Sequence, residues 1–177
     1  TEKGHFANFR YAPNEKLMAF TKTVNKGVEL WVLDISSAKA TKITEANLNA
    51  NITRPYIWFK DSNSLLVQFL PQNRQSLINT KEVVPTGPTV SVSEAGVKAQ
   101  NRTYQDLLKN PNDEFNFEQL TLSELRKVNI DGNSTNWKPK AMYRSAYFSP
   151  DGNYVMITTI EKPFSYLVPY YRFPSKT

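Results

Sequence analysis

A reverse turn between two apolar runs constrains the fold of this chain more than any other feature. Residues 147–156 read Tyr-Phe-Ser-Pro-Asp-Gly-Asn-Tyr-Val-Met, so Ser-Pro-Asp-Gly lies between residues that favour β-strands. Pro150 fixes φ at the first turn position, and Gly152 readily adopts the positive φ that a tight reversal requires. The stretch therefore predicts an antiparallel hairpin.

Two weaker copies of this hairpin occur earlier in the chain. In residues 9–20, Tyr11 takes the place of Phe148 and Pro13 the place of Pro150. In residues 56–67 the aromatic residue is Trp58, but Lys60 replaces the proline. Tyr11 and Trp58 are 47 residues apart, close to the roughly 40–50 residues of one four-stranded propeller blade.

A second repeated unit supports this spacing. Residues 29–35 align with residues 124–130, and a polar turn and a short β-like stretch follow each, at 41–44 and at 135–138. The order is thus hairpin, loop, strand, turn and strand. We expect an all-β fold, namely a partial β-propeller of about two to three four-stranded antiparallel blades.

The interval between the second and third hairpins predicts a long insertion. Trp58 and Phe148 are 90 residues apart, and only one strand-turn-strand unit lies between them. We place the insertion at about 71–119, where several prolines and glycines argue against regular sheet. A capping-box-like pattern at 103–106 predicts a short helix over 104–110, ended by Pro111.

The predicted blades do not make a closed ring. They cover about 6–50, about 51–141 with the insertion, and the start of a third blade at about 142–177. Propellers usually contain four to eight blades. We therefore interpret residues 1–177 as one fragment of an N-terminal β-propeller domain, with open sheet edges that could lead to self-association.

Composition narrows the class of protein. Apolar residues make up 40% and charged residues 21% of the chain, as in a folded globular protein. No apolar stretch of about 18 residues predicts a membrane span. The 22 Lys and Arg residues are scattered, so the net charge of +6 predicts no nucleic-acid partner. The first residues do not resemble a signal peptide. We expect an exported or periplasmic protein whose signal peptide has been removed, with a cytoplasmic location as the alternative.

The sequence contains no recognisable catalytic, metal or cofactor site. It has no cysteine, its one histidine is His5, and no glycine pair brackets a serine in the Gly-x-Ser-x-Gly pattern of α/β-hydrolases. The carboxylates of Asp113, Glu114 and Glu118 are expected to be solvated charges of a polar insertion, and no metal or other cofactor is predicted.

Aromatic and basic residues in the insertion and the tail are the candidate substrate-binding residues. The tail, residues 164–174, is unusually rich in aromatic side chains. It fits a buried strand separated from its partners, or a surface that faces a ligand or a second domain. Under the second interpretation the candidates are Arg102, Tyr104, Tyr166 and Arg172, since they lie outside the repeats.

These motifs resemble a known family. Residues 148–154 resemble the blade motif of TolB-like and prolyl oligopeptidase-type propellers. Residues 87–90, 102–111 and 163–170 are similar to the propeller of prolyl oligopeptidase-family serine peptidases of the dipeptidyl peptidase-like kind found in Bacteroidetes-type bacteria, and to the chloroplast glutamyl peptidase branch. The turn at 12–15 and Lys60 depart from the usual Ser-Pro-Asp-Gly.

The resemblance implies a function for the intact protein that this chain does not itself carry. Family members cleave peptides with a Ser-Asp-His triad in a C-terminal α/β-hydrolase domain, and none of those three residues lies in this sequence. The propeller would cover that domain, restrict access and help to bind a peptide substrate. The alternative is a TolB-like propeller that serves as a protein-interaction module.

Overall fold

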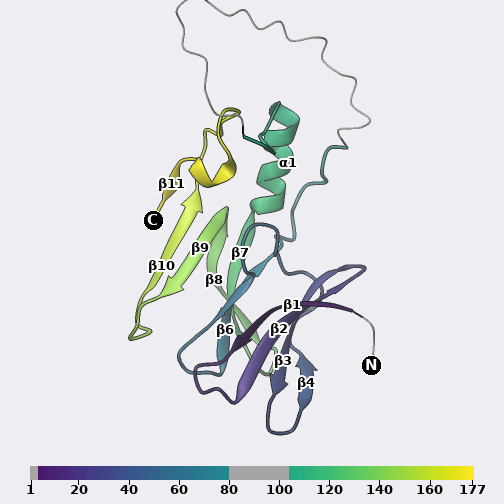
Figure 1. The fold of residues 1–177 in the computed structure, drawn as a ribbon, viewed down its shortest axis with the longest axis vertical. Helices are drawn as coiled ribbons and strands as arrows, with labels where there is room; N and C mark the ends of the chain where they lie inside the picture. Colours follow the sequence, from purple (N-terminus) through teal and green to yellow (C-terminus); the bar gives the residue numbers. More distant parts are fainter. Residues whose placement is uncertain (1–3, 80–103) are drawn as a thin grey trace, which may run out of the picture.

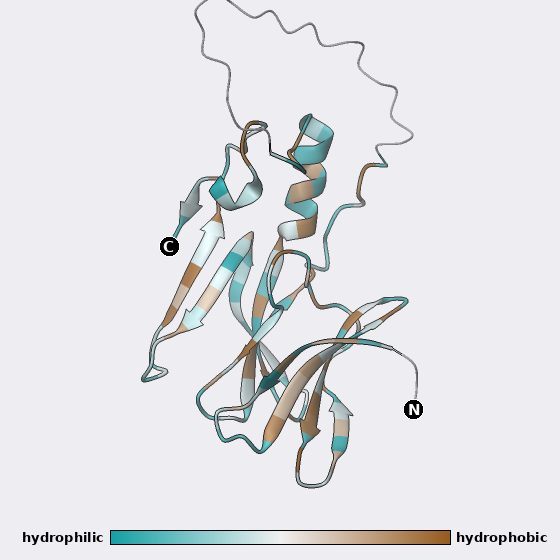
Figure 2. Ribbon diagram, in the orientation of Figure 1, coloured by the Kyte–Doolittle hydropathy of each residue, from teal (hydrophilic) through white to brown (hydrophobic). Residues whose placement is uncertain are grey.

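The computed structural model describes residues 4–79 and 104–177, which form three antiparallel sheets (Figure 1). The first sheet is a four-stranded meander in the order β1-β2-β3-β4. Its strands are β1 (His5–Tyr11), β2 (Leu17–Val24), β3 (Gly27–Asp34) and β4 (Lys39–Lys42). Figure 2 shows the hydrophobic positions of this sheet mainly on β2 and β3, whereas β4 is largely teal and white.

The second sheet has the same meander order but is interrupted in sequence. Its strands are β5 (Tyr56–Trp58), β6 (Ser64–Phe69), β7 (Ser123–Asn129) and β8 (Ser134–Ala141). The segment from residue 70 to residue 122 lies between β6 and β7, which still pair without a register shift from Ser64↔Asn129 to Phe69↔Glu124. A long insertion thus joins the second and third strands of one blade-like sheet.

The third sheet has the order β11-β10-β9. It contains β9 (Tyr143–Phe148), β10 (Val155–Ile160) and the two-residue strand β11 (Ser175–Lys176), which pairs with the end of β10. The tail between β10 and β11 includes a single 3-10 turn, η1 (Tyr170–Arg172). The expected all-β fold, a partial propeller with one partly helical insertion, is confirmed.

The three predicted hairpins share one turn geometry. In each hairpin, the residue that follows the aromatic end of the first strand donates its backbone N–H across the turn. The bonds run from Ala12 to the carbonyl of Leu17 (2.8 Å), from Phe59 to that of Ser64 (2.9 Å) and from Ser149 to that of Tyr154 (2.9 Å). The left-handed position is Glu15 (φ 58°), Ser62 (φ 57°) or Gly152 (φ 77°). Proline is therefore not required, because Lys60 occupies the same turn.

An acceptor side chain holds each of these turns. Asn14, Asp61 and Asp151 each accept a backbone N–H two residues further on, from Lys16, Asn63 and Asn153 at 3.0, 2.9 and 3.1 Å. Burial alone would raise the pKa of Asp61, but hydrogen bonds from Ser64 and Asn63 outweigh it and hold that pKa below its ordinary value. The carboxylate form is thus the one that the turn stabilises.

The predicted helix over 104–110 is wrong, because those residues are not helical. The helix is α1 (Pro111–Thr121), and it begins where the prediction ended it. The side chain of Asn110 caps it by accepting the N–H of Asp113 at 3.0 Å. Proline suits the first helical position, since its N–H would have no intrahelical partner there and its φ is preset for a helix.

Two apolar clusters place the second sheet between the other two. One cluster joins Ala19, Leu30 and Val32 of the first sheet to Leu65 and Val67 on β6, among others. The other cluster combines β6 and β7 with β9, through residues that include Leu66, Leu125 and Tyr143. Because successive side chains of a strand point to opposite faces, β6 is covered on both sides and all six of its residues are buried.

Tyr56 on β5 connects the second sheet to the first. Its hydroxyl lies within hydrogen-bond distance of the carbonyls of Asn8 and Ala19, the latter at 2.8 Å. Only 1% of Tyr56 is exposed, and this burial raises the pKa of its phenol well above the ordinary value. Trp58 adds a second link from Nε1 to the carbonyl of Arg10 at 3.1 Å.

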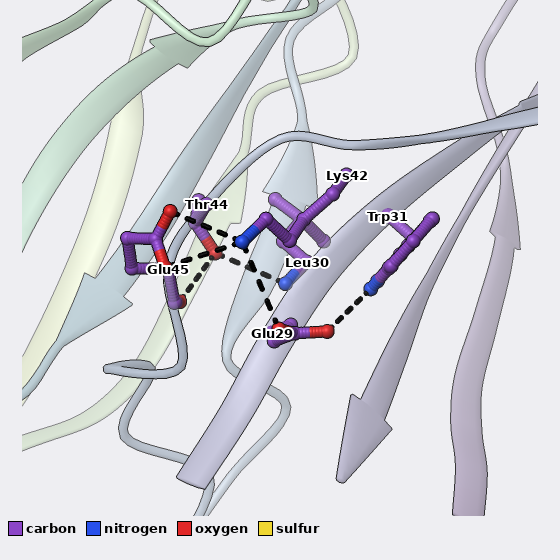
Figure 3. A network of polar contacts seen from close by, with 6 residues as sticks. All are labelled: Glu29, Leu30, Trp31, Lys42, Thr44 and Glu45. Carbon is purple, nitrogen blue, oxygen red and sulfur yellow. Dashed lines mark hydrogen bonds and ion pairs between the residues drawn. The ribbon is translucent and has the colours of Figure 1, made fainter. Parts of the chain in front are cut away.

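A polar network fixes the end of the first sheet (Figure 3). Lys42 Nζ lies 3.9 Å from Glu29 and 3.1 Å from Glu45, and Trp31 Nε1 donates to Glu29 at 2.8 Å. The hydroxyl of Thr44 accepts the N–H of Leu30 at 3.0 Å. Part of the basic charge in this region is therefore balanced locally.

Replacing Tyr56 by Phe should destabilise the fold. The change leaves the inter-sheet carbonyls without their hydroxyl partner, and we expect a loss of about 1–3 kcal/mol in the free energy of unfolding. Urea unfolding of the two proteins measures it. Tyr154→Phe is the matched control, because 74% of Tyr154 is exposed. Equal losses in the two variants would contradict the proposed link.

Replacing Asp61 by Ala should lower the free energy of unfolding by about 1 kcal/mol at neutral pH. This is less than the ~1.5–3 kcal/mol of a hydrogen bond to a charged group, because the side chain is partly exposed. Since the folded-state pKa of Asp61 is lowered, its contribution exists above the ordinary value of 3.8 and is lost as the pH falls through the folded-state pKa. The difference between the parent and the variant should therefore shrink in acid. Asp61→Asn, which keeps an acceptor oxygen, is the control, and a pH-independent difference would argue against the carboxylate.

Candidate functional site

The aromatic tail packs against helix α1, so the insertion and the tail form one body at one end of the molecule (Figure 1). The ring of Phe117 on α1 lies 5.1 Å from that of Phe164 and 5.5 Å from that of Phe173. Phe173, Met142 and Ile160 are the buried centre of this cluster. The interpretation of the tail as a buried strand is wrong, because residues 164–174 form no strand and β11 begins only after them, at Ser175.

Three of the four predicted binding residues lie around this body. The guanidinium of Arg172 lies 5.4 Å from the centre of the Tyr104 ring, within the range of a cation–π contact. Tyr166 donates its hydroxyl to Glu114 on α1, and this hydrogen bond raises the pKa of the Tyr166 phenol. Arg102 lies outside the described residues. The fold thus joins the insertion to the tail, but it does not show what they bind.

Exposed aromatic side chains surround these residues. Tyr166, Leu167, Tyr170 and Tyr171 are 39–65% exposed, although the tail also contributes Phe173 to the core. We call the surface made by Tyr104, Tyr166, Tyr170, Tyr171 and Arg172 the insert–tail surface. It offers aromatic faces and one cation, a combination suited to peptide groups and carboxylates.

The carboxylates of the insertion each have a partner. Asp113 accepts the N–H of Lys109 at 2.9 Å, Glu114 accepts from Tyr166, and Glu118 forms an ion pair with Lys162 at 2.7 Å. None of the three residues is buried, so these partners lie at positions that solvent still reaches. In the described residues, no group of His, Asp and Glu side chains is arranged to hold a metal ion.

Asparagine and glutamine side chains hold the insertion on the sheets. Asn49 donates to the carbonyls of Leu120 and Leu122, both at 2.9 Å, at the end of α1. Asn116 bonds both the N–H and the carbonyl of Ile78, at 2.8 and 2.9 Å. These contacts keep the described parts of the insertion at a fixed place although they are far apart in sequence.

Sequence reasoning missed a cavity between the second and third sheets. It has a volume of about 220 Å³ and is lined by β5, β6, β7 and β9, with Arg54 and Gln68 among its residues. Gln68 follows the apolar run Leu65-Leu66-Val67 and is only 8% exposed. A polar residue inside an apolar strand run is the signal that could have indicated this site.

Within the described residues, no helix is long and apolar enough to cross a membrane. The three sheets and their shared hairpins define this chain as part of a β-propeller. A search of family models gives no match. Individual proteins do match, both in sequence and in fold.

The chain is similar to two plant proteins. It is 38% identical over 152 residues to a probable chloroplastic glutamyl endopeptidase of Oryza sativa subsp. japonica, which covers 84% of this chain and 16% of that protein. The corresponding protein of Arabidopsis thaliana is 33% identical and covers 83% of this chain and 15% of its own length. The chain thus spans about a sixth of the curated relatives it matches.

A solved structure supports the fold. The uncomplexed acylaminoacyl peptidase of Pyrococcus horikoshii superposes with a TM-score of 0.51 at 17% identity, over 94% of this chain and 22% of that protein. Together with the sequence matches, it confirms the resemblance to peptidase propellers: the chain has the fold of part of a propeller and is similar in sequence to glutamyl endopeptidases. The expectation of a bacterial source finds no support in the plant relatives.

Replacing Phe117 by Ala should loosen the insertion and the tail together. Phe117 contacts three aromatic rings of the tail, and losing a large apolar side chain from such a cluster costs about 2–4 kcal/mol. Hydrogen–deuterium exchange should rise in α1 and residues 164–173 but not in the first sheet. Phe115→Ala on the same helix is the control. A uniform rise over all three sheets would contradict a local body.

Proposed function

We propose that this chain is the non-catalytic propeller portion of a serine peptidase, which gates or binds peptide substrates while a separate α/β-hydrolase domain cleaves them. The single observation that carries the proposal is the match to glutamyl endopeptidases over most of this chain but only about a sixth of theirs. The rest of such a protein has ample length for a catalytic domain. Peptide hydrolysis then belongs to the intact protein, with the hydrolase domain and the peptide as partners.

The insert–tail surface is the proposed contact for the peptide or for the hydrolase domain. Arg172, whose guanidinium lies beside Tyr104, supplies a cation, and Tyr166 and Tyr170 supply partly exposed rings. Arginine binds carboxylates well because its guanidinium can donate two parallel hydrogen bonds. Acidic side chains or chain termini of a peptide would fit this chemistry. Arg102 belongs to the same proposal by its place in the sequence.

The compartment follows from the same relatives. Both are described as chloroplastic, and an exported or periplasmic location is the alternative from the bacterial resemblance. Either location needs a targeting segment on the intact protein. Fractionation of source cells with an antibody against this chain would distinguish the two.

The first experiment tests catalysis in the full-length protein. We expect a serine-directed covalent probe to label it and to abolish its cleavage of a Glu-containing peptide. The same probe should not label residues 1–177. A full-length protein without a reactive serine and without turnover would favour the alternative, a TolB-like interaction module. Size-exclusion chromatography would show whether open sheet edges lead to self-association.

Replacing Arg172 by Ala in the full-length protein should lower kcat/KM for peptide hydrolysis by about five- to thirtyfold, mainly through KM. This range corresponds to the ~1–2 kcal/mol of a cation–π or charge-assisted contact. Lys176→Ala, which removes a neighbouring exposed cation on β11, is the control. Tyr166→Phe should have a smaller effect in the same direction. If both Arg172→Ala and Lys176→Ala behave like the parent, the insert–tail surface does not contact substrate.

A further inference from the structure

The cavity between the second and third sheets lies where two edge strands approach each other. Among residues 4–79 and 104–177, β5 pairs only with β6 and β9 only with β10, so within this part of the chain each has one edge without a strand partner. Consecutive residues of both edges line the cavity, at 53–57 and at 145–147. Backbone groups on such an edge can pair with an extended peptide. The cavity therefore combines side-chain walls with open strand edges.

Gln68 gives this cavity a buried polar group. It lies two residues after Leu66 on β6, so both side chains are on the same face, and Leu66 and Ile57 are also part of the lining. Gln68 is 8% exposed, so its amide is a polar group in a mostly apolar part of the cavity wall. A hydrogen bond between this amide and a ligand group would be partly shielded from water, which strengthens it.

Two arginines lie in or next to the cavity lining, at equivalent positions of two blades. Arg54 precedes Trp58 by four residues, as Arg144 precedes Phe148 by four. Arg54 lines the cavity, and Arg144 is next to Ser145, which also lines it. Neither side chain forms an ion pair or hydrogen bond with any described residue. Arg54 is exposed and Arg144 half-buried, so their charge is available to an anionic partner.

We propose that this cavity binds a carboxylate of a peptide, with Arg54 supplying the charge and Gln68 a neutral hydrogen-bond donor. The volume of about 220 Å³ is smaller than the ~300–1,000 Å³ of pockets that hold a whole small molecule, so it suits one side chain or one chain end. Ile57, Leu66 and Leu125 offer an apolar wall to the carbon atoms of that group. The peptide beyond it would run along the open edge of β5 or β9.

The carboxylate has two possible sources, an acidic side chain or the C-terminus of the peptide. Both present the same two oxygens to a guanidinium and an amide. The inference deepens the proposed function. It depends on that function in one respect, namely that the ligand is a peptide. Its site is separate from the insert–tail surface and needs no catalytic step.

The experiment measures peptide binding to the full-length protein by fluorescence anisotropy, after treatment with a serine-directed inhibitor. Three labelled hexapeptides differ only in the carboxylate: one has an internal Glu and an amidated end, one has Gln and a free end, and one has neither. We expect one or both carboxylate peptides to bind at least about tenfold more tightly than the third, as a charge-assisted hydrogen bond allows. The stronger of the two identifies the source.

Variants assign the effect to the cavity. Arg54→Gln should reduce this preference about tenfold, and Gln68→Glu should reduce it further because it places a negative charge inside. Gln68→Leu, which matches its apolar neighbours, should weaken binding without unfolding the protein. Lys39→Gln on β4 makes the same charge change as Arg54→Gln at an exposed site away from the cavity and should leave binding unchanged. Thermal unfolding checks that each variant is folded.

Two results would overturn the inference. One is equal affinity for all three peptides, and the other is a preference that Arg54→Gln and Lys39→Gln change equally. A protein with no peptidase activity that still shows an Arg54-dependent preference would refute the proposed function but keep this site. A protein that cleaves peptides but shows no carboxylate preference would keep the proposed function and refute this site.

Discussion

The hydroxyl of Tyr56 joins two sheets that the chain builds separately, and the rest of the packing depends on that contact. Its bonds reach the carbonyls of Asn8 and Ala19, so one side chain on β5 is tied to both β1 and β2. This fixes which face of the second sheet meets the first. Because strand side chains alternate, the opposite face, with Ile57 and Leu66, must then meet β9. The cavity next to Gln68 is a consequence of this arrangement.

Local turn chemistry explains why the hairpins could be predicted. Each turn needs an acceptor side chain at one position and a left-handed residue next to it, and short sequence patterns contain that information. The second hairpin shows which part is essential. Lys60 replaces proline there without changing the turn, whereas the acceptor Asp61 is kept and still bonds the N–H of Asn63. The aromatic residue and the acceptor were thus better guides than the proline.

The helix and the tail could not be predicted in the same way, because competing signals decide them. Thr103-Tyr104-Gln105-Asp106 resembled a capping box, but Asn110 followed by Pro111 is a stronger helix start and moves the helix seven residues along. The tail looked like a strand by composition. Its rings instead pack on Phe117, a contact between residues about fifty positions apart that no local pattern reports. The pairing of Tyr104 with Arg172 is of this same long-range kind.

The insertion and the cavity differ in how the fold controls them. β6 and β7 keep six paired positions although residues 70–122 separate them, since the free energy of closing a loop rises only slowly with its length. The sheet therefore tolerates almost any insertion at this place, and the insert–tail surface can vary without altering the sheets. The cavity cannot vary so freely, because Leu66 and Leu125 in its wall are also core residues of the second cluster. A carboxylate contact shared by all substrates is more suited to the cavity, whereas contacts that differ between relatives are more suited to the insert–tail surface.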